Sequence, residues 1–217
     1  MENINYNTPQ NINLTIAVDA RYFLYPEFAE TSSKKYILYV LKYIAKYYKN
    51  INFDLYFEAI SDYTKVKEIL GEEQFNYHHF DVTQKINGDL FFIPDFFTVS
   101  PIESTSLLKY TNDVPVFAFV SDLHYEYNKI LQEHISYNDL CIYNGKKDLA
   151  KETNITFITP SQYTSDELSK LQIDKKNIVT IPLGSEHLDN RIRDKQEIQE
   201  KKLLICHLLQ DLYHTLF

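Results

Sequence analysis

Short apolar runs alternate with helical patterns along most of the chain. An apolar run of four to seven residues is typical of a buried strand. The run at 114–120 is apolar throughout, which favours a central strand covered on both faces. The clear runs lie at 14–18, 53–57, 89–93, 114–120, 155–159 and 178–181, and 75–80 is a weaker candidate.

Between these runs, apolar residues recur at the spacing of helices. Gly71 is typical of a helix end, and Thr164 with Glu167 has the spacing of a capping box that starts a helix. Strand–helix alternation of this kind indicates βαβ units. We therefore predict one Rossmann-like α/β domain, with a mostly parallel sheet flanked by helices. The helices are predicted over 33–48 and 63–70, near Leu107, over 125–140, and from Thr164 onward.

The predicted domain spans 14–190, between an N-terminal arm at 1–13 and a C-terminal tail at 191–217. The charged first part of the tail has a helical pattern, so the tail is predicted to be helical. Its apolar end at 203–217 fits either a helix docked on the domain or the first strand of a further unit.

Composition narrows the classes of function. The formal net charge is -8, from 22 Lys and Arg against 30 Asp and Glu. Nucleic-acid binders present a basic face, so such a partner is disfavoured. The cysteines, Cys141 and Cys206, lie far apart and indicate free thiols in a reducing compartment. The sequence has neither a signal-peptide pattern nor a run of about 20 apolar residues. It predicts a cytoplasmic protein without a transmembrane segment, for which peripheral membrane contact stays open.

Polar residues directly follow four of the predicted strands. In an open parallel sheet, ligands bind beyond the carboxyl ends of the strands, so these residues are expected to share one rim. We predict catalytic roles for Asp122 and His124. Substrate-binding roles are predicted for the others, which are Asp19, Arg21, Asp95, Ser121 and Ser161.

Each candidate also has a structural alternative. Asp122 and His124 could orient and deprotonate a hydroxyl or bind a sugar, or they could cap and begin the next helix. Ser161 could bind a polar ligand at a helix N-terminus or serve as a turn or cap residue. Arg21 could neutralise a phosphate or pair with a carboxylate on the surface.

Several kinds of site are disfavoured. His78 and His79 lack a third ligand at metal spacing, so no metal site is predicted. The glycine patterns of dinucleotide and P-loop sites do not occur in a chain with only 4 glycines, so no such cofactor is expected. An unrelated protein such as a small hydrolase is the least favoured interpretation, because no Gly-x-Ser-x-Gly elbow is present.

Three segments, in order along the chain, carry a family resemblance. The most specific is 157–168, Phe-Ile-Thr-Pro-Ser-Gln-Tyr-Thr-Ser-Asp-Glu-Leu, followed by 177–184, Asn-Ile-Val-Thr-Ile-Pro-Leu-Gly. It resembles the segment that closes the N-terminal domain of retaining GT-B glycosyltransferases of the family 4-like group. The run 114–123 resembles that family's central strand and turn. Residues 16–21, followed by Lys35-Tyr36, resemble its opening strand and helix.

The resemblance implies the acceptor-side half of a GT-B fold. In that family the donor is a nucleotide-diphosphate sugar held mainly by a C-terminal half, and transfer usually needs no metal. By position, Ser121 stands where the family has a strand-end His, and Ser161 matches the family's Ser at the next helix start. Residues 31–34, Thr-Ser-Ser-Lys, stand where the family has a glycine-rich loop. The chain ends where the donor-binding half should begin, so the resemblance implies a truncated enzyme.

Two functions of different classes follow. The first is a glycosyltransferase of polysaccharide biosynthesis, in which this domain binds a glycan or lipid-linked acceptor and a partner chain supplies the donor half. The second is a non-catalytic binding or scaffolding domain derived from such an enzyme. Ser121 in the His position and the missing glycines favour the second, since a fold alone does not fix a function.

Overall fold

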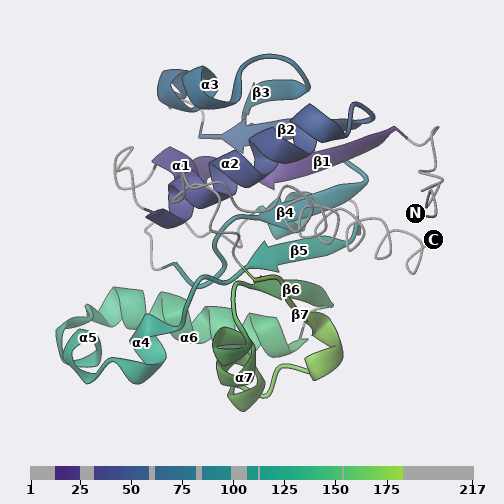
Figure 1. Ribbon diagram of the computed structural model, residues 1–217. Coiled ribbons are helices and arrows are strands. Elements are labelled where there is room, and N and C mark those ends of the chain that lie inside the picture. The colour runs from purple at the N-terminus through teal and green to yellow at the C-terminus, as the bar shows by residue number, and fades with distance from the viewer. Residues whose placement is uncertain are drawn as a thin grey trace, which may run out of the picture. The chain divides into compact units, whose positions relative to one another are not determined.

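A computed structural model describes residues 13–24, 32–58, 62–81, 85–98, 107–111, 113–152 and 154–182 (Figure 1). The chain folds as two compact units. Unit 1 comprises Met1–Phe92 and Leu107–Val114, and unit 2 comprises Ile93–Ser106 and Pro115–Phe217. The predicted arm at 1–13, except its last residue, and the whole tail at 191–217 lie outside the described residues.

Unit 1 is built on parallel strands. These are β1 (Leu14–Asp19), β2 (Ile51–Phe57), β3 (Phe75–His79) and β4 (Leu90–Ile93), whose last residue belongs to unit 2. They lie in the order β3-β2-β1-β4, with each parallel to its neighbours. In register, Ile16 lies opposite both Phe53 of β2 and Leu90 of β4. β1 is therefore a central strand of this unit, which explains why Ala17 and Val18 are fully buried.

The helices of unit 1 are α1 (Arg21–Leu24), α2 (Ser32–Tyr47), α3 (Thr64–Leu70) and the 3-10 turn η1 (Leu108–Tyr110). α2 follows β1 in the chain and leads back to β2, so it runs antiparallel to both strands; it passes in front of them in Figure 1. Gly71 ends α3 with a φ of 84°, a backbone conformation that glycine adopts without strain. The apolar face of α2 is buried and consists of Ile37, Leu38, Leu41, Ile44 and Ala45.

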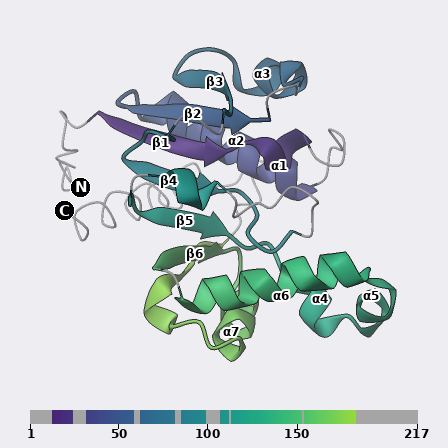
Figure 2. The same cartoon turned by 180° about the vertical axis from the view of Figure 1, so that it is seen from behind.

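Unit 2 has its own parallel strands, β5 (Val116–Phe119), β6 (Ile155–Thr159) and β7 (Ile178–Thr180), in that order. Its helices are α4 (His124–Tyr127), α5 (Lys129–His134), α6 (Tyr137–Glu152) and α7 (Gln162–Lys170), followed by the turn η2 (Lys175–Asn177). α7 is nearer the viewer in Figure 1, and α6 is nearer in Figure 2. Phe96 and Phe157 form the centre of the core, with their rings edge-to-face at 5.1 Å.

The predicted α/β class and the parallel strands are confirmed, including the weak candidate that became β3. Two predictions about helices need correction, and one helix was missed. The pattern over 125–140 is not one helix but α4, α5 and the start of α6, which continues to Glu152. The helix α1 was not predicted, and α7 begins at Gln162, before the predicted start at Thr164. Among the described residues, none of the helices has the length and apolar character needed to cross a membrane.

Candidate functional site

The carboxyl ends of β5 and β6 bring Asp122 and Ser161 to one edge of unit 2, and a backbone hydrogen bond adds the segment that carries Asp95. The backbone N–H of Val120, just after β5, donates to the carbonyl of Ile158 in β6 at 2.9 Å. The N–H of Phe96 donates to the carbonyl of Phe119 at 3.0 Å. Asp122 follows Val120 by two residues, Ser161 follows Ile158 by three, and Asp95 directly precedes Phe96, so the three lie along one edge of the unit.

Asp122 lies half-buried at this edge, where the hydroxyl of Ser121 donates to its Oδ2 at 3.3 Å. The negative charge of Asp122 acts on two tyrosines, Tyr125 and Tyr143. Burial raises the pKa of Tyr125, and the carboxylates of Asp139 and Asp122 raise it further. Burial also raises the pKa of Tyr143, together with the charges of Glu126 and Asp122. Both phenols therefore stay protonated at neutral pH and can donate hydrogen bonds.

The Tyr143 side chain lies in the middle of this cluster. Its ring packs against Phe97 at 5.6 Å and Tyr125 at 5.8 Å, and the ammonium of Lys147 stands 5.7 Å from its centroid. Lys147 also pairs with Glu126 at 2.8 Å. The Tyr143 hydroxyl is buried and has no hydrogen-bond partner among the residues that the structure describes. A buried donor of this kind is costly to leave unsatisfied.

A buried lysine supports the segment that carries Asp95. Lys146 of α6 is almost fully buried, and its ammonium donates to the carbonyl oxygen of Thr98. A buried ammonium needs such partners because its desolvation is unfavourable. This contact fixes the segment 94–98 against α6.

Ser161 serves as the N-cap of α7. Its backbone is extended, and its hydroxyl oxygen accepts a hydrogen bond from the N–H of Thr164 at 3.2 Å. The structural alternative for Ser161 is thus observed, and Thr164 is not the cap because it lies inside the first turn, where it is buried. Glu167 does not close a capping box; its carboxylate accepts from Lys170 at 2.5 Å, which lowers the pKa of Glu167.

Replacing Ser161 with alanine is expected to lower the free energy of unfolding by about 1 kcal/mol, because the N–H of Thr164 loses its acceptor. Urea denaturation followed by circular dichroism measures the change. Ser169→Ala is the matched control: its hydroxyl donates to the Ser165 carbonyl within the same helix, and its removal should change stability by less than about 0.5 kcal/mol. Equal effects of the two substitutions would contradict the capping role.

Asp19 and Arg21 lie in unit 1 and bind each other. The guanidinium donates from Nε to Asp19 Oδ1 at 2.8 Å and from Nη2 to Oδ2 at 2.7 Å. Both side chains are buried. The alternative for Arg21 assumed a carboxylate on the surface, whereas the observed partner is inside the unit at the end of β1. Such a bidentate pair holds the turn after β1 in place.

The histidines contribute less to the described site. His124 begins α4, and its side chain lies outside the described residues. His78 lies on β3, where its ring stacks on Tyr56 at 5.1 Å and its Nε2 is 3.4 Å from Asp54. Within the described ranges, no group of three His, Cys, Asp or Glu side chains could hold a metal ion.

Sequence reasoning missed the two tyrosines beside Asp122. Tyr125 and Tyr143 belong to different helices, 18 positions apart in the chain. In a chain with 18 tyrosines, nothing in the sequence marks these two. Tyr125 follows the Asp122–His124 motif directly, and this position is the one signal that could have drawn attention to it.

No protein-family model matches the sequence, and a search of curated proteins finds no match. Among solved structures, the chain resembles HepE (Alr3699) from Anabaena, described in complex with UDP and glucose. The sequence identity is 11% and the TM-score is 0.46. The likeness covers 80% of this chain and 45% of HepE, so the chain spans less than half the length of that protein. The α/β assignment rests on the strand pairing within each unit.

Proposed function

We propose that this chain is the acceptor-side part of a retaining GT-B-type glycosyltransferase. It would bind a hydroxyl-bearing sugar acceptor at the edge of unit 2 and would transfer a sugar only with a donor-binding half. The sequence segments 16–21, 114–123 and 157–184 support the family. The acidic surroundings of Asp122, with two tyrosines nearby, support its assignment to the acceptor side.

The charges around Asp122 favour a neutral ligand over a phosphate. Asp122 and Asp139 both act on Tyr125, whereas Glu126, which acts on Tyr143 with Asp122, is paired with Lys147. A nucleotide pyrophosphate would meet carboxylates here, and like charges repel. A sugar hydroxyl, in contrast, can donate to a carboxylate and accept from a protonated phenol.

In the proposed mechanism, each residue at this edge of unit 2 has a separate role. Asp122 accepts a hydrogen bond from the reacting hydroxyl of the acceptor, and His124 takes part in orienting and deprotonating that hydroxyl. Ser121 holds the Asp122 carboxylate through its own hydroxyl, and Asp95 binds a further hydroxyl of the same ligand. The donor half supplies the nucleotide-diphosphate sugar and the positive charge that stabilises the leaving group.

Replacing Asp122 with alanine is expected to weaken sugar binding by roughly ten- to a hundredfold, because a hydrogen bond to a charged group contributes about 1.5–3 kcal/mol. Saturation-transfer NMR on the full chain, with methyl glucoside, methyl galactoside and N-acetylglucosamine as probes, measures the affinity. Asp148→Ala is the matched control, because this aspartate is exposed on α6 and pairs only loosely with Lys151 at 3.8 Å. Sugar binding that is unchanged in Asp122→Ala would contradict the proposal.

Ser121 in place of the family's histidine favours a second candidate, a non-catalytic binding domain. The two candidates differ when a donor is present. The proposed transferase part turns over once a donor-binding half is supplied, whereas the binding domain shows no turnover with any donor half. Hydrolysis of UDP-glucose by the isolated chain, abolished in Asp122→Ala and in His124→Ala, would overturn both, since it would show a complete enzyme.

A further inference from the structure

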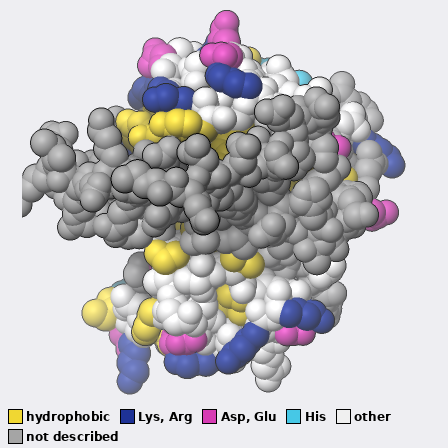
Figure 3. Space-filling view, turned by 45° about the vertical axis from the view of Figure 1, so that its right-hand side comes forward, with side chains coloured by type: hydrophobic (Ala, Val, Ile, Leu, Met, Phe, Trp, Pro, Cys, Tyr) yellow, Lys and Arg dark blue, Asp and Glu magenta, His cyan; other side chains and the backbone are white. Residues whose placement is uncertain are grey.

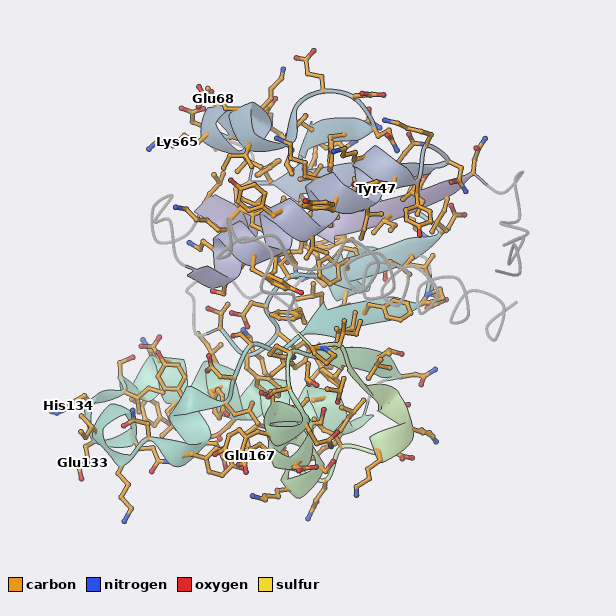
Figure 4. The ribbon with its side chains drawn as sticks, viewed as in Figure 1. Tyr47, Lys65, Glu68, Glu133, His134 and Glu167 are labelled. Atoms are coloured by element: carbon orange, nitrogen blue, oxygen red, sulfur yellow. The ribbon has the colours of Figure 1, made fainter. Side chains whose placement is uncertain are left out.

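One face of α7 brings a tyrosine, a carboxylate and a lysine together. Tyr163, Glu167 and Lys170 lie four and three residues apart, so they share one side of the helix. Tyr163 is 70% exposed, and Figure 4 labels Glu167 on this helix. Glu167 is buried, and its Oε1 accepts a hydrogen bond from the Lys170 ammonium at 2.5 Å. The face therefore combines an open aromatic ring with an ion pair whose charges cancel.

A second tyrosine, Tyr127 of α4, lies against this face of α7. The Lys170 ammonium stands 5.8 Å from the centroid of the Tyr127 ring, and 44% of this tyrosine is exposed. Burial raises the pKa of the Tyr127 phenol, and the neighbouring Glu167 carboxylate raises it further. Tyr163 acts electrostatically on both Tyr127 and Lys170. The four side chains therefore form one cluster at the surface of unit 2, the α4–α7 tyrosine cluster.

The Glu167 carboxylate in this cluster has an unused acceptor. Its Oε2 is buried and has no hydrogen-bond partner among the residues that the structure describes. A buried oxygen of a charged group is costly to leave without a donor. The Lys170 side chain is 64% exposed, so it can turn aside and let a ligand hydroxyl supply that donor.

We propose that Tyr127, Tyr163 and Glu167 form a subsite for a second sugar residue of the acceptor, so that the acceptor is a neutral oligosaccharide. This inference rests on the function proposed above. The C–H groups on the face of a sugar ring stack on the electron-rich face of a tyrosine ring, and sugar hydroxyls can donate to a carboxylate. The cluster has no uncompensated charge, which favours a neutral sugar over a phosphate. Hydrophobic side chains in the lower part of Figure 3 likewise lie beside both acidic and basic ones.

The α4–α7 tyrosine cluster adjoins the edge of unit 2 that holds Asp122. α7 begins directly after Ser161, one of the edge residues, and Tyr163 is two positions further along. Burial, Glu126, Tyr127 and Asp122 all raise the pKa of Tyr143, so Tyr143 lies within electrostatic reach of both Tyr127 and Asp122. An acceptor with its reacting sugar at Asp122 can therefore extend its next residues toward the two exposed tyrosines.

Sugar binding to the full chain tests the inference. In saturation-transfer NMR titrations, at least one of maltotriose, cellotriose and chitotriose should bind roughly three- to tenfold more tightly than its single sugar, methyl glucoside or N-acetylglucosamine. Tyr163→Ala should remove that gain and leave the affinity for the single sugar unchanged, because the exposed ring contacts only the second residue. Tyr127→Leu should act in the same way. Asp122→Ala should instead weaken all probes by the same factor.

The matched control is Tyr137→Ala, which removes an exposed tyrosine of α6 in the same unit and should keep the gain. Circular dichroism checks that each variant is folded, and Tyr163→Ala reports even where Tyr127→Leu unfolds. The inference is overturned if no trisaccharide binds more tightly than its single sugar, or if the gain survives in Tyr163→Ala. A dimer in sugar-free solution that dissociates in Tyr163→Ala would overturn it too, because the tyrosines would then bind a second copy.

The same titrations separate this inference from the function on which it rests. Asp122→Ala that weakens none of the probes contradicts the proposed function, whatever the effect of Tyr163→Ala. A normal effect of Asp122→Ala, together with a chain-length gain that is absent or insensitive to Tyr163→Ala, contradicts the subsite alone. Failure of every sugar to bind the unchanged chain contradicts both.

Discussion

Replacing Phe157 with alanine is expected to lower the free energy of unfolding of unit 2 by about 3–5 kcal/mol. Phe157 is fully buried at the centre of β6, and its ring meets Phe96 edge-to-face at 5.1 Å. The substitution removes this aromatic contact and leaves a cavity between β6 and the segment that carries Asp95. Urea denaturation followed by far-ultraviolet circular dichroism measures the loss.

Tyr163→Ala provides the comparison for Phe157→Ala. Tyr163 belongs to α7 of the same unit, but 70% of its surface is exposed, so its removal should change stability by less than about 0.5 kcal/mol. A small effect of Phe157→Ala, similar to that of Tyr163→Ala, would show that β6 is not central to the unit.

Replacing Asp19 with alanine is expected to destabilise unit 1 by about 3–5 kcal/mol, because it leaves the Arg21 guanidinium buried without its bidentate carboxylate. The double substitution Asp19→Leu/Arg21→Met should recover part of that loss, since it also removes the buried positive charge. Thermal and urea denaturation of the single and double variants measure the coupling.

Lys49→Met is the control for the buried pair. Lys49 pairs with Glu73 at 2.9 Å, and their side chains are 61% and 80% exposed. Breaking this surface pair should cost about 0–1 kcal/mol. An Asp19→Ala chain that is as stable as Lys49→Met would show that the Asp19–Arg21 pair contributes little to the stability of unit 1.

The strands could be predicted from the sequence because a buried strand is recognisable as a short apolar run. β5 lies in an uninterrupted apolar run, and β1 is apolar apart from Thr15 up to its last residue, as expected for strands with little contact with solvent. The helix boundaries were harder. Asn128 accepts from the N–H of Ile130 at 3.0 Å before α5, and Ser136 accepts from the N–H of Asp139 at 3.1 Å before α6. Both are good capping residues, but the apolar periodicity runs across them and conceals the breaks.

The candidate site was predictable only in part. Strand-end positions such as Asp122 follow from topology, because the carboxyl ends of parallel strands meet at one edge. Whether a residue there binds a ligand or a neighbour depends on partners that are distant in sequence. Arg21 turned inward to Asp19, and Ser161 capped α7. The charge of Asp122 acts on Tyr143 because α6 packs so that Tyr143 lies near it. No local sequence pattern encodes that packing.

The direction of α2 has a consequence for how unit 1 opens. The helix runs back along β1 and β2, so its axis is roughly aligned with the strands. Because α2 packs along these strands, it must detach before they can separate, and their backbone N–H groups should exchange with solvent only in that opening.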